Sequence, residues 1–225
     1  MLEGGASMNF KVEREVLNLG LKVVGITITG LDNKIKTKEF LKFKDKAYKA
    51  LKEKYNNFDI ETDLILRGFN ELHKKIGIKR RKNTPISENI LKRFLKNANL
   101  PSSNKLVELC NIVILDSRLS IGMHDMNKID GTVTLKQATS NISYNFSEER
   151  TINQGEYIYT DNKNILYRLE VNQNPKTIVS EDTKNIFITI EGNEATSAEY
   201  IMEVASEIID LITSYCGGNA KIIYK

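Results

Sequence analysis

The sequence contains no tryptophan, only three prolines, two histidines and two cysteines among its 225 residues. No apolar run approaches the roughly 18 residues of a membrane-spanning helix, and no basic start followed by an apolar segment resembles a signal peptide. Cys110 and Cys216 are far apart in the chain, which favours free thiols over a disulfide or a zinc site. We expect a cytoplasmic protein that contacts no membrane and holds no metal ion or cofactor.

The composition that remains is typical of a globular protein, with 40% hydrophobic and 28% charged residues. A chain of this length can form one large domain with a sizeable core. Residues 1–7 are rich in small residues and precede a second methionine, so we interpret them as a cloning remnant. We therefore expect a single domain over residues 8–225.

Basic residues are concentrated in the first half of the chain, although the net charge is only +4. Residues 1–110 hold 23 Lys and Arg against 13 Asp and Glu, whereas residues 111–225 hold 10 against 16. The densest basic run begins at His73, which we expect on the surface, and contains Lys74, Lys75, Lys79, Arg80, Arg81 and Lys82. Such a run can bind phosphate groups of a nucleic acid, although solvated helices have the same composition.

Hydrophobic periodicity predicts an α+β fold, with a basic helical N-terminal portion and helices packed on a mixed β core. Helices are expected over residues 37–55, 63–77, 87–95, 104–117 and 195–215, with Ser87 as the N-cap of the third. Strands are expected over residues 21–29, 132–135, 155–160, 164–171, 185–191 and 220–224.

The stretch 104–131 joins an apolar helix to a polar turn, and we expect a functional site there. The helix carries one apolar stripe, with Asn111 beside it as a link between helix and loop. The turn brings His124 and Asp125 to a sheet edge. The near-neutral pKa of histidine permits His124 to act as a general base or to orient water, and a structural role is equally consistent. Asp125 is better suited to bracing the turn.

A second group of polar residues alternates with apolar ones in the expected strand 164–171. Arg168, Glu170 and Asn172 would share one face, and Tyr167, Leu169 and Val171 the other. In a central strand the polar face forms a pocket wall, whereas at a sheet edge it lies in water.

Several segments also carry a family resemblance. They are LVELCNIVILDSRLSIGMHDMNKIDGTVTL, RGFNELHKKIG, PISENILKRFL, GEYIYTDNKNILYRLEVNQ and EDTKNIFITIEGN. In this order the set resembles the B3/B4 domain, the tRNA-editing module of the phenylalanyl-tRNA synthetase beta chain, and is more similar to its free-standing single-domain relatives. The resemblance covers about residues 60–218.

The resemblance implies a B3/B4-type fold and hydrolysis in trans of the ester of a mischarged aminoacyl-tRNA, whose acceptor end is the expected partner. The synthetase motif Pro-Met-His-Ala-Phe-Asp aligns with Ser120–Asp125, so its editing histidine falls on Gly122, two residues before His124. Its editing glutamate corresponds to Glu191 when two extra residues are allowed, and Thr189 occupies the strict position. The catalytic candidates are thus His124 and Glu191, and the substrate-binding candidates are Asn111, Asp125, Arg168, Glu170 and Asn172.

Two other classes of function stay open. One is a tRNA-binding module without catalysis, which Gly122 at the histidine position favours. The other is a hydrolase of a small amino-acid derivative, which applies if the lysines are only a solvated face. An aminoacyl ester is already activated, so hydrolysis needs no nucleophilic serine or cysteine. Glu170 and Glu191 on one pocket would favour a polar or cationic amino acid. The sequence predicts neither the tRNA nor the oligomeric state.

Overall fold

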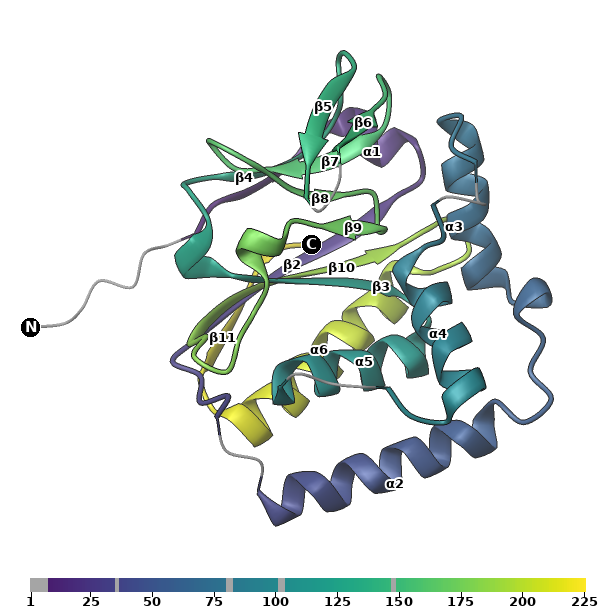
Figure 1. The fold of residues 1–225 in the computed structure, drawn as a ribbon, viewed down its shortest axis with the longest axis vertical. Coiled ribbons are helices and arrows are strands. Elements are labelled where there is room, and N and C mark those ends of the chain that lie inside the picture. The colour runs from purple at the N-terminus through teal and green to yellow at the C-terminus, as the bar shows by residue number, and fades with distance from the viewer. Residues whose placement is uncertain (1–7, 35–36, 80–82, 101–103, 147–148) are drawn as a thin grey trace, which may run out of the picture.

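The computed structural model describes residues 8–34, 37–79, 83–100, 104–146 and 149–225. Its strands form a sheet of order β1-β4-β7-β8-β9, a second sheet of order β11-β2-β10-β3 and a small β5-β6 ladder. Several helices lie under the second sheet, and the short helix Arg14–Asn18 lies on the other side, beside the first sheet (Figure 1). The predicted α+β class is confirmed. Within the described residues, no helix is both long and apolar enough to cross a membrane.

The element boundaries follow the expected periodicity closely in most places. The strands are β1 (Phe10–Val12), β2 (Lys22–Thr29), β3 (Ser120–Asp125), β4 (Val133–Gln137), β5 (Ile142–Asn145), β6 (Glu149–Ile152), β7 (Tyr157–Thr160), β8 (Ile165–Arg168), β9 (Asn172–Gln173), β10 (Asn185–Gly192) and β11 (Asn219–Tyr224). The helices are α1 (Arg14–Asn18), α2 (Lys38–Lys54), α3 (Leu64–Lys75), α4 (Ile86–Asn97), α5 (Lys105–Ser117) and α6 (Ala198–Cys216), with short 3-10 turns η1 (Ile60–Thr62), η3 (Met126–Lys128) and η4 (Pro175–Thr177).

Two local predictions are wrong. Ser87 is not an N-cap, because α4 begins one residue earlier with Pro85 in the cap position, and Ser87 is buried. His124 lies inside strand β3 and not in a turn, since the chain enters the sheet directly after α5. The left-handed backbone of Arg118 (φ 62°) ends α5, and β3 begins two residues later. Asn104 caps the other end of α5 by accepting a hydrogen bond from the Val107 amide (3.0 Å).

The four-stranded sheet has two faces of different character because side chains alternate along each strand. Strand β10 runs antiparallel between β2 and β3. Its residues Ile186, Ile188 and Ile190 join the core under the helices. The intervening residues, Phe187, Thr189 and Glu191, face the five-stranded sheet and are fully buried.

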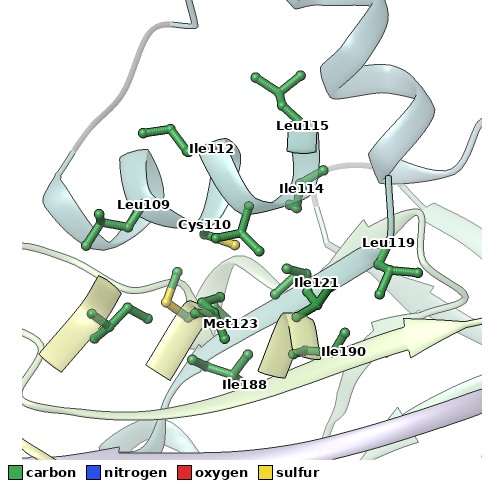
Figure 2. Packing of buried hydrophobic residues seen from close by; sticks show 14 of the residues in the cluster. Leu109, Cys110, Ile112, Ile114, Leu115, Leu119, Ile121, Met123, Ile188 and Ile190 are labelled. Carbon is green, nitrogen blue, oxygen red and sulfur yellow. The ribbon is translucent and has the colours of Figure 1, made fainter. Parts of the chain in front are cut away.

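The helix face of this sheet holds the main apolar core. Helices α5 and α6 pack on it, α4 contacts α5 and β3, and α2 covers α5 from outside (Figure 1). Figure 2 shows side chains of α5 packed above Ile121, Met123, Ile188 and Ile190 of the sheet. The single apolar stripe predicted for α5 understates its burial, because the sheet, α2, α4 and α6 all contact it.

Candidate functional site

Three tyrosines and two carboxyl groups meet between the two sheets, and we call Tyr157, Tyr159, Tyr167, Glu170 and Glu191 the tyrosine–carboxyl cluster. Tyr157 and Tyr159 are two residues apart on β7 and so share its inner face. The Tyr159 hydroxyl donates a hydrogen bond to Glu191, and the Tyr157 hydroxyl donates one to Glu170. No cluster side chain is more than 3% exposed, so these polar groups interact in a medium of low polarity.

Glu170 reaches the interior because the strand predicted over 164–171 is interrupted. Leu169 has a left-handed backbone (φ 50°), its amide donates to the Tyr157 carbonyl (3.0 Å), and β9 begins only at Asn172. Arg168 and Glu170 therefore do not share a solvent-facing surface, and both are buried with Leu169 between them. The alternation that the sequence predicts across this segment is wrong for that reason.

His73 on α3 lies beside this carboxylate, with its Nε2 2.7 Å from Glu170 Oε1. The surface position predicted for His73 is wrong, since the side chain is 1% exposed and lies one helical turn after the buried Phe69. Burial opposes protonation of the ring, but the Glu170 charge and the Asn83 backbone raise the pKa of His73 above its usual value. The raised pKa favours a protonated ring, and the two groups then form a buried ion pair.

Glu191 lies in a different electrostatic environment. Burial, followed by the nearby Glu170 charge, raises the pKa of Glu191 well above its ordinary range, which favours the protonated carboxyl. It lies opposite Ser120 of β3, yet its Oε2 is left without a hydrogen bond within the described part of the chain. A neutral and a charged carboxyl side by side can serve as proton donor and anion in one reaction.

Arg168 and Asn172, predicted to bind substrate, have protein partners. The Arg168 Nε donates to Glu156 (2.6 Å), and its Nη1 donates to the Asn83 side-chain oxygen (2.8 Å). Asn172 is half-buried, and its amide oxygen is placed to accept from Arg150 (3.1 Å) and Tyr144 (3.2 Å) of the β5-β6 ladder. The Arg168 charge is thus balanced inside the fold, and Asn172 joins β9 to that ladder.

His124 is buried among uncharged groups. Its ring stacks on Phe187 with centroids 6.4 Å apart, and its Nδ1 lies 2.8 Å from the Thr177 hydroxyl and 3.2 Å from the Gln173 amide. Burial lowers the pKa of His124 to about 4, so the ring is neutral at neutral pH. With 1% of its surface exposed, this histidine packs as part of the fold.

The other two candidates of the central stretch lie outside the cluster. Asp125 accepts hydrogen bonds from the Asn127 amide (3.1 Å) and the Thr183 hydroxyl (2.8 Å), which braces η3 against the loop before β10. Asn111 is half-buried on α5, which packs on the opposite face of the four-stranded sheet. The sheet therefore separates Asn111 from the tyrosine–carboxyl cluster.

Gly122 and Thr189 are direct partners across β3 and β10. A Cβ atom at Gly122 would lie 2.8 Å from Thr189 Oγ1 and 3.4 Å from the Tyr167 ring. The space that a side chain at position 122 needs is therefore occupied by Thr189. This pair fills the positions that, by resemblance, hold the editing histidine and glutamate.

Three of the six residues predicted to contact RNA lie in the described part of the chain. Lys74 pairs with Glu71 and Lys75 with Glu194, each at 2.6 Å, and Lys79 is exposed. Arg80, Arg81 and Lys82 lie outside the described residues. The pairs leave Lys74 and Lys75 on the surface with part of their charge screened.

Four surface cavities of about 230 to 360 Å³ are found in the described part of the chain, and cluster residues line none of these four. The largest of these four cavities lies between β2, α6 and Tyr224. No group of three or more His, Cys, Asp or Glu side chains suited to a metal ion occurs within the described ranges.

Comparison with known proteins gives consistent relatives. The chain is 28% identical over 102 residues to the phenylalanine–tRNA ligase beta subunit of Mycoplasma genitalium, a match that covers 44% of this chain and 13% of that protein. An N-terminal fragment of the phenylalanyl-tRNA synthetase beta subunit from Pyrococcus horikoshii shares the fold, with a TM-score of 0.51 and 15% identity over 96% of this chain and 50% of the fragment. Residues 71–217 match the model of the B3/4 domain, and the chain belongs to that family.

Proposed function

We propose that this protein binds tRNA and hydrolyses the ester of a mischarged aminoacyl-tRNA. The two relatives described above are a tRNA ligase beta subunit and a tRNA synthetase beta-subunit fragment, which favours tRNA as the partner. The observation that carries the proposal is the pair of buried carboxyl groups between the sheets, with Glu170 2.7 Å from His73 and Glu191 accepting a hydrogen bond from Tyr159. Such a pair can supply both a hydrogen-bond donor and an anion in the interior between the two sheets.

Each carboxyl suits a different part of an aminoacyl ester. Protonated Glu191, to which the Tyr159 hydroxyl donates a hydrogen bond, can itself donate a hydrogen bond to the oxygen on which negative charge develops when water attacks the carbonyl. Glu170 can accept hydrogen bonds from an ammonium group of the substrate. In this proposal His124 takes no proton, because its ring is packed against Phe187 and is hard to protonate.

The test is single-turnover deacylation of a panel of mischarged tRNAs. We expect the wild-type protein to accelerate ester cleavage of at least one of them. Glu191→Leu removes the donor at nearly constant volume and should slow that reaction by about 10²-fold, since a well-placed donor contributes that much to stabilising the transition state. The matched control is Glu203→Leu, an exposed residue of α6, which should leave the rate unchanged. Equal rates for the two variants would exclude Glu191 from the reaction.

Binding is tested by reversing the charges of Lys79, Arg80 and Arg81 to Glu. We expect weaker tRNA binding and a shallower dependence of affinity on salt, because each lost phosphate contact reduces the slope of log K against log salt by about 0.7 to 0.9. Unchanged, salt-independent affinity would contradict a role for the basic run.

A control with the same change in net charge is available on α2. Its exposed face, far from the cluster on the outer side of α5, carries Lys42, Lys46 and Lys49. Reversing these three lysines should alter affinity much less, as expected for a solvated helix face. A larger loss from the α2 variant would locate the RNA contact on α2 instead.

A tRNA-binding module without catalysis is the second candidate. It is favoured by Thr189 filling the space beside Gly122 and by the closed cluster. Its signature is tRNA binding that depends on the basic run while no tRNA of the panel is deacylated faster than in buffer.

A further inference from the structure

The two histidines of this sequence lie in opposite environments. His124 faces Phe187, Tyr167, Thr177 and Gln173, none of which carries a charge. His73 faces the Glu170 carboxylate at 2.7 Å, and both side chains are at most 1% exposed. Only the second histidine is placed to act on a charged group of the tyrosine–carboxyl cluster.

A balance of charges explains why Glu170 needs this histidine. Another buried carboxylate nearby, Glu156, is paired with Arg168 at 2.6 Å, so that arginine already has a counterion. An unpaired carboxylate in the interior is costly and takes up a proton. A cation at His73 keeps Glu170 ionised without drawing on Arg168.

His73 also belongs to a connected network. Ile86, at the start of α4, donates its amide to the Glu170 carbonyl (2.8 Å). Asn83 accepts from Arg168 through its side chain, and its backbone stabilises the protonated imidazole. Glu170 is thus held from α3 by His73, from β7 by the Tyr157 hydroxyl and at the start of α4 by the Ile86 amide.

We propose that His73 is the positioning residue of the cluster: as an imidazolium it holds Glu170 ionised and oriented, and Glu170 then selects the aminoacyl group. The inference rests on the proposed hydrolysis of aminoacyl esters. His73 acts through Glu170 and contacts no reacting atom.

The proposal predicts a loss of function at alkaline pH. The groups that face the pair are Arg168 on β8, Tyr157 on β7 and Glu191 on β10. Since the pKa of His73 is raised in the fold, its ion pair is complete below about pH 6.5 and is lost as the pH rises through that raised value. Glu170 then loses its counterion, and the selection that it provides should weaken.

The first experiment does not depend on activity. In protein labelled at histidine, NMR should show two imidazoles, one titrating above pH 6.5 and one near pH 4. His124→Asn should remove the second and so assign the first. Glu170→Gln should lower the pH at which the His73 imidazole titrates, because the neighbouring charge that favours its protonation is removed. A His73 that titrates below pH 6.5 in the wild type, or at an unchanged pH in Glu170→Gln, would overturn the proposal.

The second experiment measures single-turnover deacylation from pH 6 to 9. His73→Gln retains an amide beside Glu170 but carries no charge, and it should lose roughly 10-fold in rate with tRNA affinity unchanged. It should also lose the alkaline decline, and it should add nothing to the effect of Glu170→Gln, because both act through one group. Additive losses or an unaltered pH profile contradict the positioning role. Failure of every tRNA in the panel refutes the proposed hydrolysis, and the NMR result then decides on the ion pair by itself.

Discussion

Replacing His124 with asparagine should remove a pH-dependent contribution to the stability of this fold. The imidazole is buried, stacks on Phe187 and lies 2.8 Å from the Thr177 hydroxyl. Asparagine offers an oxygen for the same contact and does not titrate. Loss of the stacking lowers the free energy of unfolding of the variant by an amount that does not depend on pH. The titration of His124 therefore appears only as a change with pH in the difference between the unfolding free energies of wild type and variant.

The magnitude follows from the lowered pKa of His124, about 4 in the fold against 6.5 for a free histidine. Between these values the unfolded chain binds a proton that the folded chain does not, so stability rises with pH by about 1.4 kcal/mol per unit. The contribution is complete above pH 6.5 and is lost as the pH falls towards 4. Over the whole window the wild type should lose about 3 kcal/mol from this residue.

Urea unfolding from pH 7.5 to pH 4.5 provides the assay, followed by far-UV circular dichroism because the protein has no tryptophan. His73 and Glu191 have raised pKa values and titrate in the opposite sense, so only the difference between the two proteins isolates His124. That difference should shift by about 2 to 3 kcal/mol in favour of the variant at low pH. A constant difference would mean that the ring is accessible to protons, and His124 would again be a candidate base.

Three further substitutions test the cluster and its surroundings. Gly122→Ala should destabilise the fold by about 1 to 3 kcal/mol through the clash with Thr189, and Thr189→Ala in the same chain should remove most of that cost; additive losses in urea unfolding would contradict the clash. Glu191→Gln should become more favourable relative to wild type as the pH rises above 4.5, because keeping the wild-type carboxyl neutral then costs progressively more; a flat difference from pH 5 to 8 would mean that Glu191 is ionised in the fold. Glu170→Gln should reduce the preference for cationic over aliphatic aminoacyl groups in deacylation, and an unchanged ranking would exclude contact between this carboxyl and the amino acid.

The sequence predicts the sheets well where side chains alternate without interruption. In β10, isoleucines at every second position face the helices, and Phe187, Thr189 and Glu191 face the other sheet. The same reasoning fails at Leu169, because a leucine gives no sign that its backbone will adopt a left-handed conformation. One such residue turns Glu170 into the interior and ends the alternation.

The predicted surface position of His73 is wrong for another reason. Its two lysine neighbours favoured a surface position, yet Leu66, Phe69 and His73 recur at steps of three and four, which is the signal that could have identified the buried face. Its partner Glu170 is almost a hundred positions away in the chain, and no local pattern predicts that contact. The sequence therefore indicates Glu170 and Glu191 as candidates, and it gives no sign that His73 lies beside one of them.

The cost of the local structure also supports the proposal that the cluster, and not His124, is the functional site. A left-handed leucine costs about 1 to 2 kcal/mol, and a buried carboxyl oxygen without a hydrogen bond costs about 1 to 3 kcal/mol. Leu169, which precedes Glu170 of the cluster, has the left-handed backbone, and Glu191 of the cluster has the oxygen without a hydrogen bond. Both lie near the buried pair of His73 and Glu170, which apolar residues could replace. His124, by contrast, lies in a regular strand with its Nδ1 at hydrogen-bonding distance from Thr177. Features that cost stability are retained where a reaction or a ligand requires them, so the tyrosine–carboxyl cluster is the better place to look for catalysis.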